Sequence, residues 1–242
     1  MIIASAQTWP AYENIEANLL DHYRIINTAA ANGVQLLVFP EMSITGYVHE
    51  AAEKLLFVEN DSRLEKLRQL AKEHNMIVIA GAPVKLNSEL HIGSFIIFPN
   101  GSISIYTKQF LHPGEEHYFV SNFVLNPVVK LEDEQIAFAI CADIDHPQHA
   151  ENARKKGASL YIASIFFSPQ GLPGAYSTLS AYAKKFSLNV LMSNFCGESW
   201  KSPAAGGSAF WTKRGEMVGK LDNTTPGLII VQKKNGHWVL KQ

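Results

Sequence analysis

The sequence is short of charge and of cysteine, and neither sign of charge is in excess. Its 242 residues contain 21 Lys and Arg against 22 Asp and Glu, so charged residues make up 18% of the chain and the net charge is −1. Globular chains usually carry charge on about a quarter of their residues. A nucleic-acid surface or a polybasic membrane contact needs an excess of Lys and Arg, and this composition argues against both. Either the core is large for the length of the chain, or part of the surface is not exposed to solvent.

The two cysteines, Cys141 and Cys196, are too few for a disulfide framework. Residues 1–10 have no basic start, and only a short apolar run precedes Trp9 and Pro10, which is unlike a secretory signal peptide. We therefore expect two free thiols in a reducing cytoplasm.

The longest uncharged stretch, from Gly157 to Ala183, is long enough to span a bilayer. Its middle, residues 168–174, reads Ser-Pro-Gln-Gly-Leu-Pro-Gly, which would break a spanning helix. We interpret the stretch as a buried strand, a loop and a helix, and expect no membrane contact.

Strands and helices alternate along the sequence. Short apolar runs predict strands, and longer segments with apolar residues at helical spacing predict helices. The predicted strands are residues 2–6, 35–39, 76–82, 91–98, 102–106, 124–129, 135–140, 160–165 and 189–193. The predicted helices are residues 14–31, 62–74, 146–156 and 176–186, and a tail from 207 to 239 alternates short strands with glycine turns. No shift in composition marks a linker, so we expect one domain over residues 1–242.

One internal similarity bears on the fold. Residues 29–38 resemble residues 153–162, because each segment reads as a helix end, a glycine and an apolar strand. Two similar halves, each a sheet carrying helices, would pack sheet on sheet into one α/β sandwich.

Three reactive side chains follow predicted strands. Glu41 comes after residues 35–39, Lys108 after residues 102–106, and Cys141 after residues 135–140. In sheets covered by helices, ligands bind at the carboxyl ends of the strands. Each residue also has a structural interpretation when taken alone: a solvated loop carboxylate, a surface lysine and a small buried thiol.

Taken together, these three side chains predict an acyl-transfer site. A thiolate is the effective nucleophile, and Glu41 could remove the Cys141 proton and later return it to a leaving amine. Lys108 could offset the negative charge and stabilise a tetrahedral oxyanion. The backbone N–H of Ala142, in the turn after Cys141, would be a second oxyanion donor.

The segments around these residues resemble the nitrilase superfamily of carbon–nitrogen hydrolases. The matching segments, in chain order, are residues 39–41, 106–111, 140–143, 193–197, 206–210 and 215–216. The resemblance covers nearly the whole chain. It implies an α/β fold, a four-layer α-β-β-α sandwich of two mixed sheets, with a Glu41–Lys108–Cys141 triad and neither metal nor cofactor. It also implies that sandwiches pair across a helical face into a homodimer or a larger homo-oligomer.

The resemblance further implies a second glutamate after the lysine, which orients the substrate or the lysine itself. Glu115 and Glu116 both stand in the right segment. Family members tend to have an aromatic pair soon after this glutamate, and Tyr118 with Phe119 fits Glu115 better. Glu116 is the alternative.

Several departures from the family pattern concern the substrate. Ala142 stands where an aromatic residue is common, Phe110 where a histidine is common, and residues 146–148 read His-Pro-Gln instead of Phe-Pro-Glu. Residues 164–169 lack a frequent asparagine and contain Phe166, which we interpret as an apolar wall of the substrate pocket. A core position for this aromatic is an equal alternative.

Two other kinds of site are disfavoured by the positions of the histidines: a Cys–His protease or thioesterase site at Cys141, and a metal site. His146 and His149 lie on the helix directly after Cys141, whereas a catalytic base must approach from another part of the fold. His91, His112 and His117 match no compact metal-ligand spacing, and Lys108 would oppose a cation.

The sequence thus predicts a hydrolase that cleaves the carbon–nitrogen bond of a small linear amide or carbamoyl compound through a cysteine thioester. A nitrilase or an amide-forming acyltransferase would use the same triad. A non-catalytic binding protein on the same fold is the alternative from another class.

Overall fold

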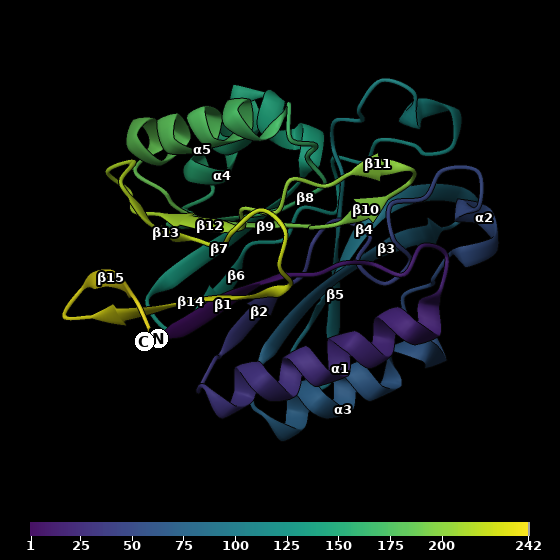
Figure 1. The fold of residues 1–242 in the computed structure, drawn as a ribbon, viewed down its shortest axis with the longest axis horizontal. Coiled ribbons are helices and arrows are strands. Elements are labelled where there is room, and N and C mark those ends of the chain that lie inside the picture. The colour runs from purple at the N-terminus through teal and green to yellow at the C-terminus, as the bar shows by residue number, and fades with distance from the viewer. Residues whose placement is uncertain (242) are drawn as a thin grey trace.

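Two mixed β-sheets lie face to face between two layers of helices (Figure 1) in the computed structural model, which describes residues 1–241. The first sheet has the strand order β15-β14-β1-β2-β3-β4-β5, and the second has the order β13-β12-β9-β8-β7-β6. Strands β1, β2 and β3 are parallel in one sheet, as are β7, β8 and β9 in the other, and the remaining ladders are antiparallel. The expected four-layer α-β-β-α sandwich is confirmed.

The strands of the first sheet are β1 (Ile2–Gln7), β2 (Leu36–Val38), β3 (Ile77–Leu86), β4 (Glu89–Ile97), β5 (Ile103–Thr107), β14 (Gly227–Lys234) and β15 (His237–Leu240). Those of the second sheet are β6 (Val129–Leu131), β7 (Glu134–Ile140), β8 (Leu160–Ile165), β9 (Asn189–Asn194), β12 (Ala209–Trp211) and β13 (Met217–Lys220). A separate small hairpin pairs β10 (Glu198–Ser199) with β11 (Ser202–Pro203).

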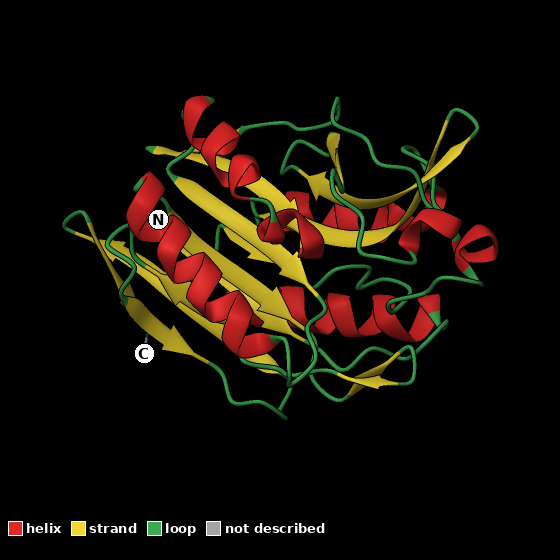
Figure 2. Cartoon of the chain, turned by 90° about the horizontal axis from the view of Figure 1, so that it is seen from above, coloured by secondary structure: helices red, strands yellow, loops and turns green. Residues whose placement is uncertain are grey.

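Each sheet has its own pair of long helices on its outer face (Figure 2). Helices α1 (Ile15–Ala31) and α3 (Glu65–Glu73) cover the first sheet, and α4 (Pro147–Lys155) and α5 (Leu172–Phe186) cover the second. A short helix, α2 (Ala52–Leu55), precedes α3. The Asn14 side chain accepts a hydrogen bond from the backbone N–H of Ala17, which is the ordinary way to begin a helix such as α1.

Three apolar layers result from this arrangement because residues in a strand alternate between its two faces. In β2, Leu36 and Val38 face the other sheet, whereas Leu37 packs with the residues under α1 and α3. In β8, Leu160 faces inward and Tyr161 packs under α4 and α5. The central strands are therefore buried on both faces, which requires continuous apolar runs.

The internal similarity corresponds to the two halves of the sandwich. Gly33 follows α1 with φ 70° and Gly157 follows α4 with φ 92°, a conformation that favours glycine. The Gln35 N–H then donates to the carbonyl of Ile2, and the Ser159 N–H donates to the carbonyl of Gln135. Each half thus uses the same step from helix to parallel strand.

The structure differs from the sequence-based prediction at two places. The strand expected over 124–129 is a loop up to Val129, because Pro127 has no N–H and the Asn126 N–H turns back onto the carbonyl of Val124. Helix α5 begins four residues before the expected 176, with Pro173 in its first turn.

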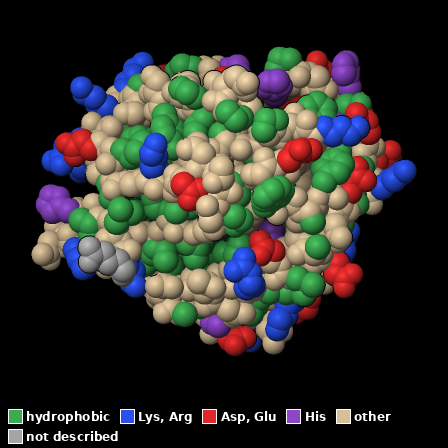
Figure 3. All heavy atoms as spheres, viewed as in Figure 1, with side chains coloured by type: hydrophobic (Ala, Val, Ile, Leu, Met, Phe, Trp, Pro, Cys, Tyr) green, Lys and Arg blue, Asp and Glu red, His purple; other side chains and the backbone are tan. Residues whose placement is uncertain are grey.

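On the face that Figure 3 shows, basic and acidic side chains are interspersed and neither sign gathers into a patch. No helix within residues 1–241 has both the length and the apolar character that crossing a membrane requires.

Candidate active site

The three strand-end residues of the sequence analysis meet between the two sheets. Glu41 follows β2, Lys108 directly follows β5 of the same sheet, and Cys141 directly follows β7 of the other sheet. Glu41 and Lys108 are fully buried, and Cys141 is 7% exposed. The surface interpretations of the carboxylate and the ammonium are therefore wrong, since water reaches neither.

Lys108 bridges two carboxylates. Its Nζ donates to Glu41 Oε1 at 2.8 Å and to Glu115 Oε1 at 2.7 Å, and all three side chains are inaccessible to solvent. Burying charges is costly unless each is paired and hydrogen-bonded, and here two anions share one cation. Buried, strongly interacting charges of this kind cluster at functional sites.

The pKa values of these groups are strongly perturbed. Burial raises the pKa of Glu41 to about 7, although the nearby Lys108 ammonium pulls it down. Burial alone would lower the pKa of Lys108, but the Glu41 carboxylate and the other anions around it raise the value above that of a free lysine. Burial together with the Glu41 charge raises the pKa of the Cys141 thiol. At neutral pH the site therefore holds a neutral thiol, an ammonium and a carboxylate poised to accept a proton.

Glu115, in the short 3-10 helix η2 (Glu115–His117), is held on both oxygens. Besides Lys108, its Oε1 accepts the Tyr47 hydroxyl at 2.6 Å, and its Oε2 accepts the backbone N–H of His112 at 2.7 Å. Glu116 is exposed and accepts the N–H of Gly114. The structure thus places Glu115, and not its neighbour, against the lysine.

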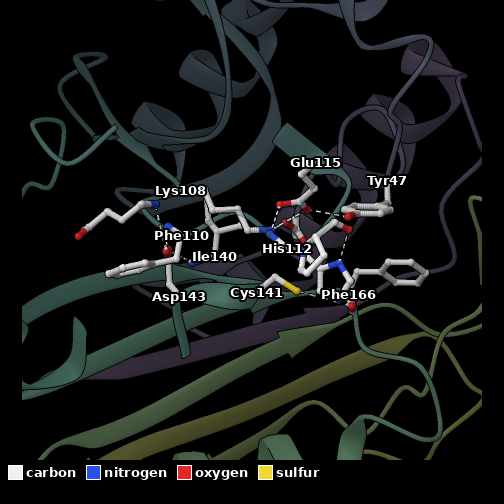
Figure 4. A network of polar contacts seen from close by, with 12 residues as sticks. Tyr47, Lys108, Phe110, His112, Glu115, Ile140, Cys141, Asp143 and Phe166 are labelled. Carbon is white, nitrogen blue, oxygen red and sulfur yellow. Dashed lines mark hydrogen bonds and ion pairs between the residues drawn. The ribbon is translucent and has the colours of Figure 1, made fainter. Parts of the chain in front are cut away.

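Cys141 stands on a sharp turn between β7 and the short 3-10 helix η3 (Cys141–Asp145). Its φ is 43°, which is uncommon for a residue with a Cβ and carries a strain of order 1–3 kcal/mol. Its Sγ lies 3.7 Å from the carbonyl oxygen of Phe166, at the end of β8. Figure 4 shows the sulfur between Phe166 on one side and the segment that contains Asp143 on the other.

Asp143 fixes this turn against the segment that contains Lys108. Its Oδ1 accepts the backbone N–H groups of Gln109 and Phe110 at 3.0 and 2.9 Å. Its Oδ2 accepts the N–H of Ile140 at 2.8 Å and the hydroxyl of Tyr106 at 2.6 Å. One buried carboxylate therefore sets the position of Cys141 relative to the strand end after β5.

Ala142, the predicted oxyanion donor, and Phe166, the predicted wall of the substrate pocket, lie beside the thiol in different ways. Ala142 is buried, 4% exposed, in η3 directly after Cys141. Phe166 is half-buried and its ring packs against Tyr47 at 5.0 Å and Phe195 at 6.0 Å between centroids. Its ring thus belongs partly to the apolar core, while its carbonyl faces Cys141.

The histidines and the second cysteine are placed elsewhere. His149 is buried between the hydroxyls of Tyr106 and Tyr161, at 2.9 and 2.8 Å. Cys196 is buried and both cysteines are free. No group of three or more His, Cys, Asp or Glu side chains in the described part of the chain is arranged to hold a metal ion.

Two side chains of the site were not singled out from the sequence. Asp143 belongs to the segment 140–143 that carries the resemblance, so its place in a Cys-x-Asp pattern was a usable signal. Tyr47 lies six residues after Glu41 in an apolar context, and nothing in its local sequence distinguishes it from a core tyrosine.

Comparisons with known proteins bear on the family and on the fold. The family model for carbon–nitrogen hydrolases matches residues 2–236. The structure is similar to that of an amidase from Nesterenkonia sp. AN1, with a TM-score of 0.85, 24% identity and coverage of 97% of this chain and 93% of the other. A cysteine-to-alanine variant of that amidase, solved in complex with butyramide, has a TM-score of 0.84, 24% identity and coverage of 95% and 89%.

Two relatives identified by sequence are named as enzymes. A nitrilase from Pyrococcus abyssi is 25% identical over 179 residues, which are 71% of this chain, and a 2-oxoglutaramate amidase from Bacillus subtilis is 27% identical over 176 residues, 72% of this chain. The match covers 68% of the length of each relative, but only 34% of an arylacetonitrilase from Aspergillus niger.

Proposed function

Because this chain belongs to the carbon–nitrogen hydrolase family, we propose that it hydrolyses a small linear amide or carbamoyl compound through a thioester on Cys141. The observation that carries the proposal is the buried contact of Lys108 with Glu41 and Glu115 at 2.8 and 2.7 Å, beside a cysteine held on a strained turn.

The first step is a proton transfer to Glu41. Its Oε1 is occupied by Lys108, whereas its Oε2 is buried and has no hydrogen-bond partner among residues 1–241. This second oxygen is therefore free to accept the Sγ proton of Cys141. With a pKa of about 7, Glu41 is ionised enough to take a proton at neutral pH and acidic enough, once protonated, to give it back.

The thiolate then attacks the carbonyl carbon, and the carbonyl oxygen becomes an oxyanion. The Lys108 ammonium and the Ala142 N–H stabilise this oxyanion, and a loss of one such donor typically costs about 10²–10³ in rate. When the tetrahedral intermediate collapses, the carbon–nitrogen bond breaks and Glu41 protonates the departing ammonia or amine. Phe166 forms part of the wall against which the acyl chain lies.

The acyl group is now a thioester on Sγ. Glu41, ionised again, takes a proton from a water molecule, and the resulting hydroxide attacks the thioester carbonyl. The second tetrahedral intermediate releases the carboxylic acid, and the proton returns to sulfur. Glu115 takes no proton in this scheme, because its two oxygens are engaged by Lys108, Tyr47 and the His112 N–H; it orients the lysine.

A nitrile is the second candidate substrate, favoured by the names of the Pyrococcus and Aspergillus relatives. Attack of the same thiolate on the nitrile carbon would give a thioimidate. Addition of water would then release ammonia and leave the same thioester.

The test is ammonia release from a panel of short amides, carbamoyl amines and nitriles, with intact-mass detection of the acyl-enzyme. We expect an adduct on Cys141 and a loss of at least about 10³-fold in turnover for Cys141→Ala. Cys196→Ala is the matched control: among the described residues this buried thiol makes no hydrogen bond with Glu41, Lys108 or Glu115, and its removal should leave turnover within about twofold. Full activity of Cys141→Ala, or an adduct on Cys196, would contradict the mechanism.

A further inference from the structure

A second buried polar atom near the site lacks a partner. His49 is 5% exposed, and its Nε2 has no hydrogen-bond partner within the described residues. More than nine in ten buried polar groups in native structures are hydrogen-bonded, so such an atom requires an explanation. His49 lies on the same segment as Glu41, whose unpartnered oxygen the proposed reaction uses.

Aromatic side chains surround His49 and connect it to the site. Its ring centroid lies 4.3 Å from that of Trp200, 4.8 Å from Tyr47 and 5.4 Å from Tyr118, which stacks on it. Tyr47 in turn packs on Phe166, which contacts Cys141, and donates to Glu115 (Figure 4). Only two ring contacts therefore separate His49 from the residue beside the nucleophile.

A groove of about 480 Å³ opens beside His49 and Tyr118. It lies between α2, the turn from β3 to β4, and the segment after η2. Its charged lining consists of Glu50, Glu53, Glu89, Lys85 and His117. Acidic side chains thus outnumber the lysine by three to one, and the groove favours a cation over an anion.

The chemistry of His49 agrees with this preference. Burial lowers the pKa of the ring, although the Glu115 carboxylate opposes the effect, so the imidazole is neutral at pH 7. A neutral imidazole has one nitrogen lone pair, which accepts a hydrogen bond from an N–H donor. The faces of Trp200 and Tyr118 attract cations as well, because an aromatic ring is negative on its face.

We propose that His49, Trp200 and Tyr118 form a subsite for the far end of a linear amide substrate, and that this end carries an ammonium or guanidinium group. The inference rests on the proposed function and specifies its substrate class. In this arrangement the amide lies at Cys141 and the cationic end donates to His49 Nε2, with the groove carboxylates close to the charge.

Three amides of equal length test the proposal: 5-aminopentanamide with an ammonium end, hexanamide with a methyl end, and adipamate with a carboxylate end. We expect kcat/KM for 5-aminopentanamide to exceed that for hexanamide by about tenfold, and that for adipamate to be the lowest. His49→Phe keeps the aromatic packing but removes the nitrogen, and should reduce the ratio of the first two values towards one. His49→Gln restores an acceptor and should recover part of the ratio. His237→Phe, an exposed histidine on β15, is the control and should leave the ratio unchanged.

Binding to Cys141→Ala, measured by calorimetry with the same three amides, separates this inference from the proposed function. Turnover of hexanamide without a preference for 5-aminopentanamide would support the hydrolase and overturn the subsite. An equal loss of kcat/KM for all three amides in His49→Phe would indicate a structural role for His49 and would also overturn the subsite. Tighter binding of 5-aminopentanamide without turnover of any amide would support the subsite and contradict the hydrolase.

Discussion

At the scale of single residues, the ionisation of Glu41 sets the pH range of the proposed reaction. Glu41 is buried with one ammonium and a second carboxylate, and its pKa is raised from the usual range to about 7. The proposed base must be ionised to accept the Cys141 proton. Protonation of the Glu41 carboxylate therefore stops the proposed reaction within the physiological pH range.

We therefore predict that kcat/KM rises about tenfold per pH unit below pH 7 and levels off above it. The charge of Glu115 raises the pKa of Glu41, so Glu115→Gln should shift the acid limb of the profile to lower pH. Exposed Glu116→Gln is the matched control and should leave the limb in place. An acid limb near pH 4.5, or an upward shift in Glu115→Gln, would show that Glu41 is not the titrating base.

At the scale of elements, the turn after β2 depends on a close approach of two backbones. Met42 has φ 48°, and the Ile44 N–H donates to the carbonyl of Gly81 on β3. The Ser43 hydroxyl contacts the Gly81 N–H at 3.2 Å and His22 Nε2, on α1, at 2.9 Å. Helix α1 and strand β3 thus hold the turn that carries Glu41.

A methyl group at Gly81 has no room in this arrangement. Its Cβ would lie 2.6 Å from the backbone nitrogen of Met42 and 3.4 Å from the carbonyl carbon of Glu41. Gly81→Ala should therefore destabilise the protein by about 1–3 kcal/mol and, by displacing Glu41, lower kcat by about 10²-fold. Urea unfolding and steady-state kinetics measure the two effects.

Gly174→Ala is the same substitution in open space, within α5. Apart from the adjoining residues and the backbone of its own helix, no atom lies within 4 Å of the added Cβ, so helix propensity should raise stability by about 0.5–1 kcal/mol without changing kcat. If Gly81→Ala kept native kcat and stability, the close packing of β3 on the Glu41 turn would not position the carboxylate.

At the scale of the whole molecule, the low share of charge has a structural cause. A sandwich with four layers buries its central strands on both faces. Its three apolar layers need many apolar residues, so a smaller share of the chain remains for charged surface positions. Only a few charged groups are found inside, and those around Lys108 form the candidate site.

The resemblance to carbon–nitrogen hydrolases implies pairing across a helical face, so we predict that the sandwiches associate there into a homodimer or a larger assembly, which would account for part of the low charge. Light scattering coupled to size exclusion should then give at least twice the chain mass of 26.8 kDa across a dilution series. A single species of chain mass at all concentrations would contradict this, and the low charge would then be explained by the core alone.

The sequence by itself determined the alternation of strands and helices, the family and the order of the strand ends that carry Glu41, Lys108 and Cys141. These features depend on local apolar periodicity and on motifs that are contiguous in the chain. The prediction of a strand over 124–129 was wrong, because a proline and a local turn prevent strand pairing there despite the apolar residues.

Only the tertiary structure decided which groups meet. Lys108 lies 67 residues from Glu41, and Tyr47 lies 68 residues from Glu115, so neither contact leaves a local signal in the sequence. The same holds for Asp143, which joins β7 to the segment after β5. His49 depends on Trp200, from a distant hairpin, for its surroundings. The physical reason is that burial and charge pairing arise from packing across two sheets, whereas the sequence specifies each sheet strand by strand.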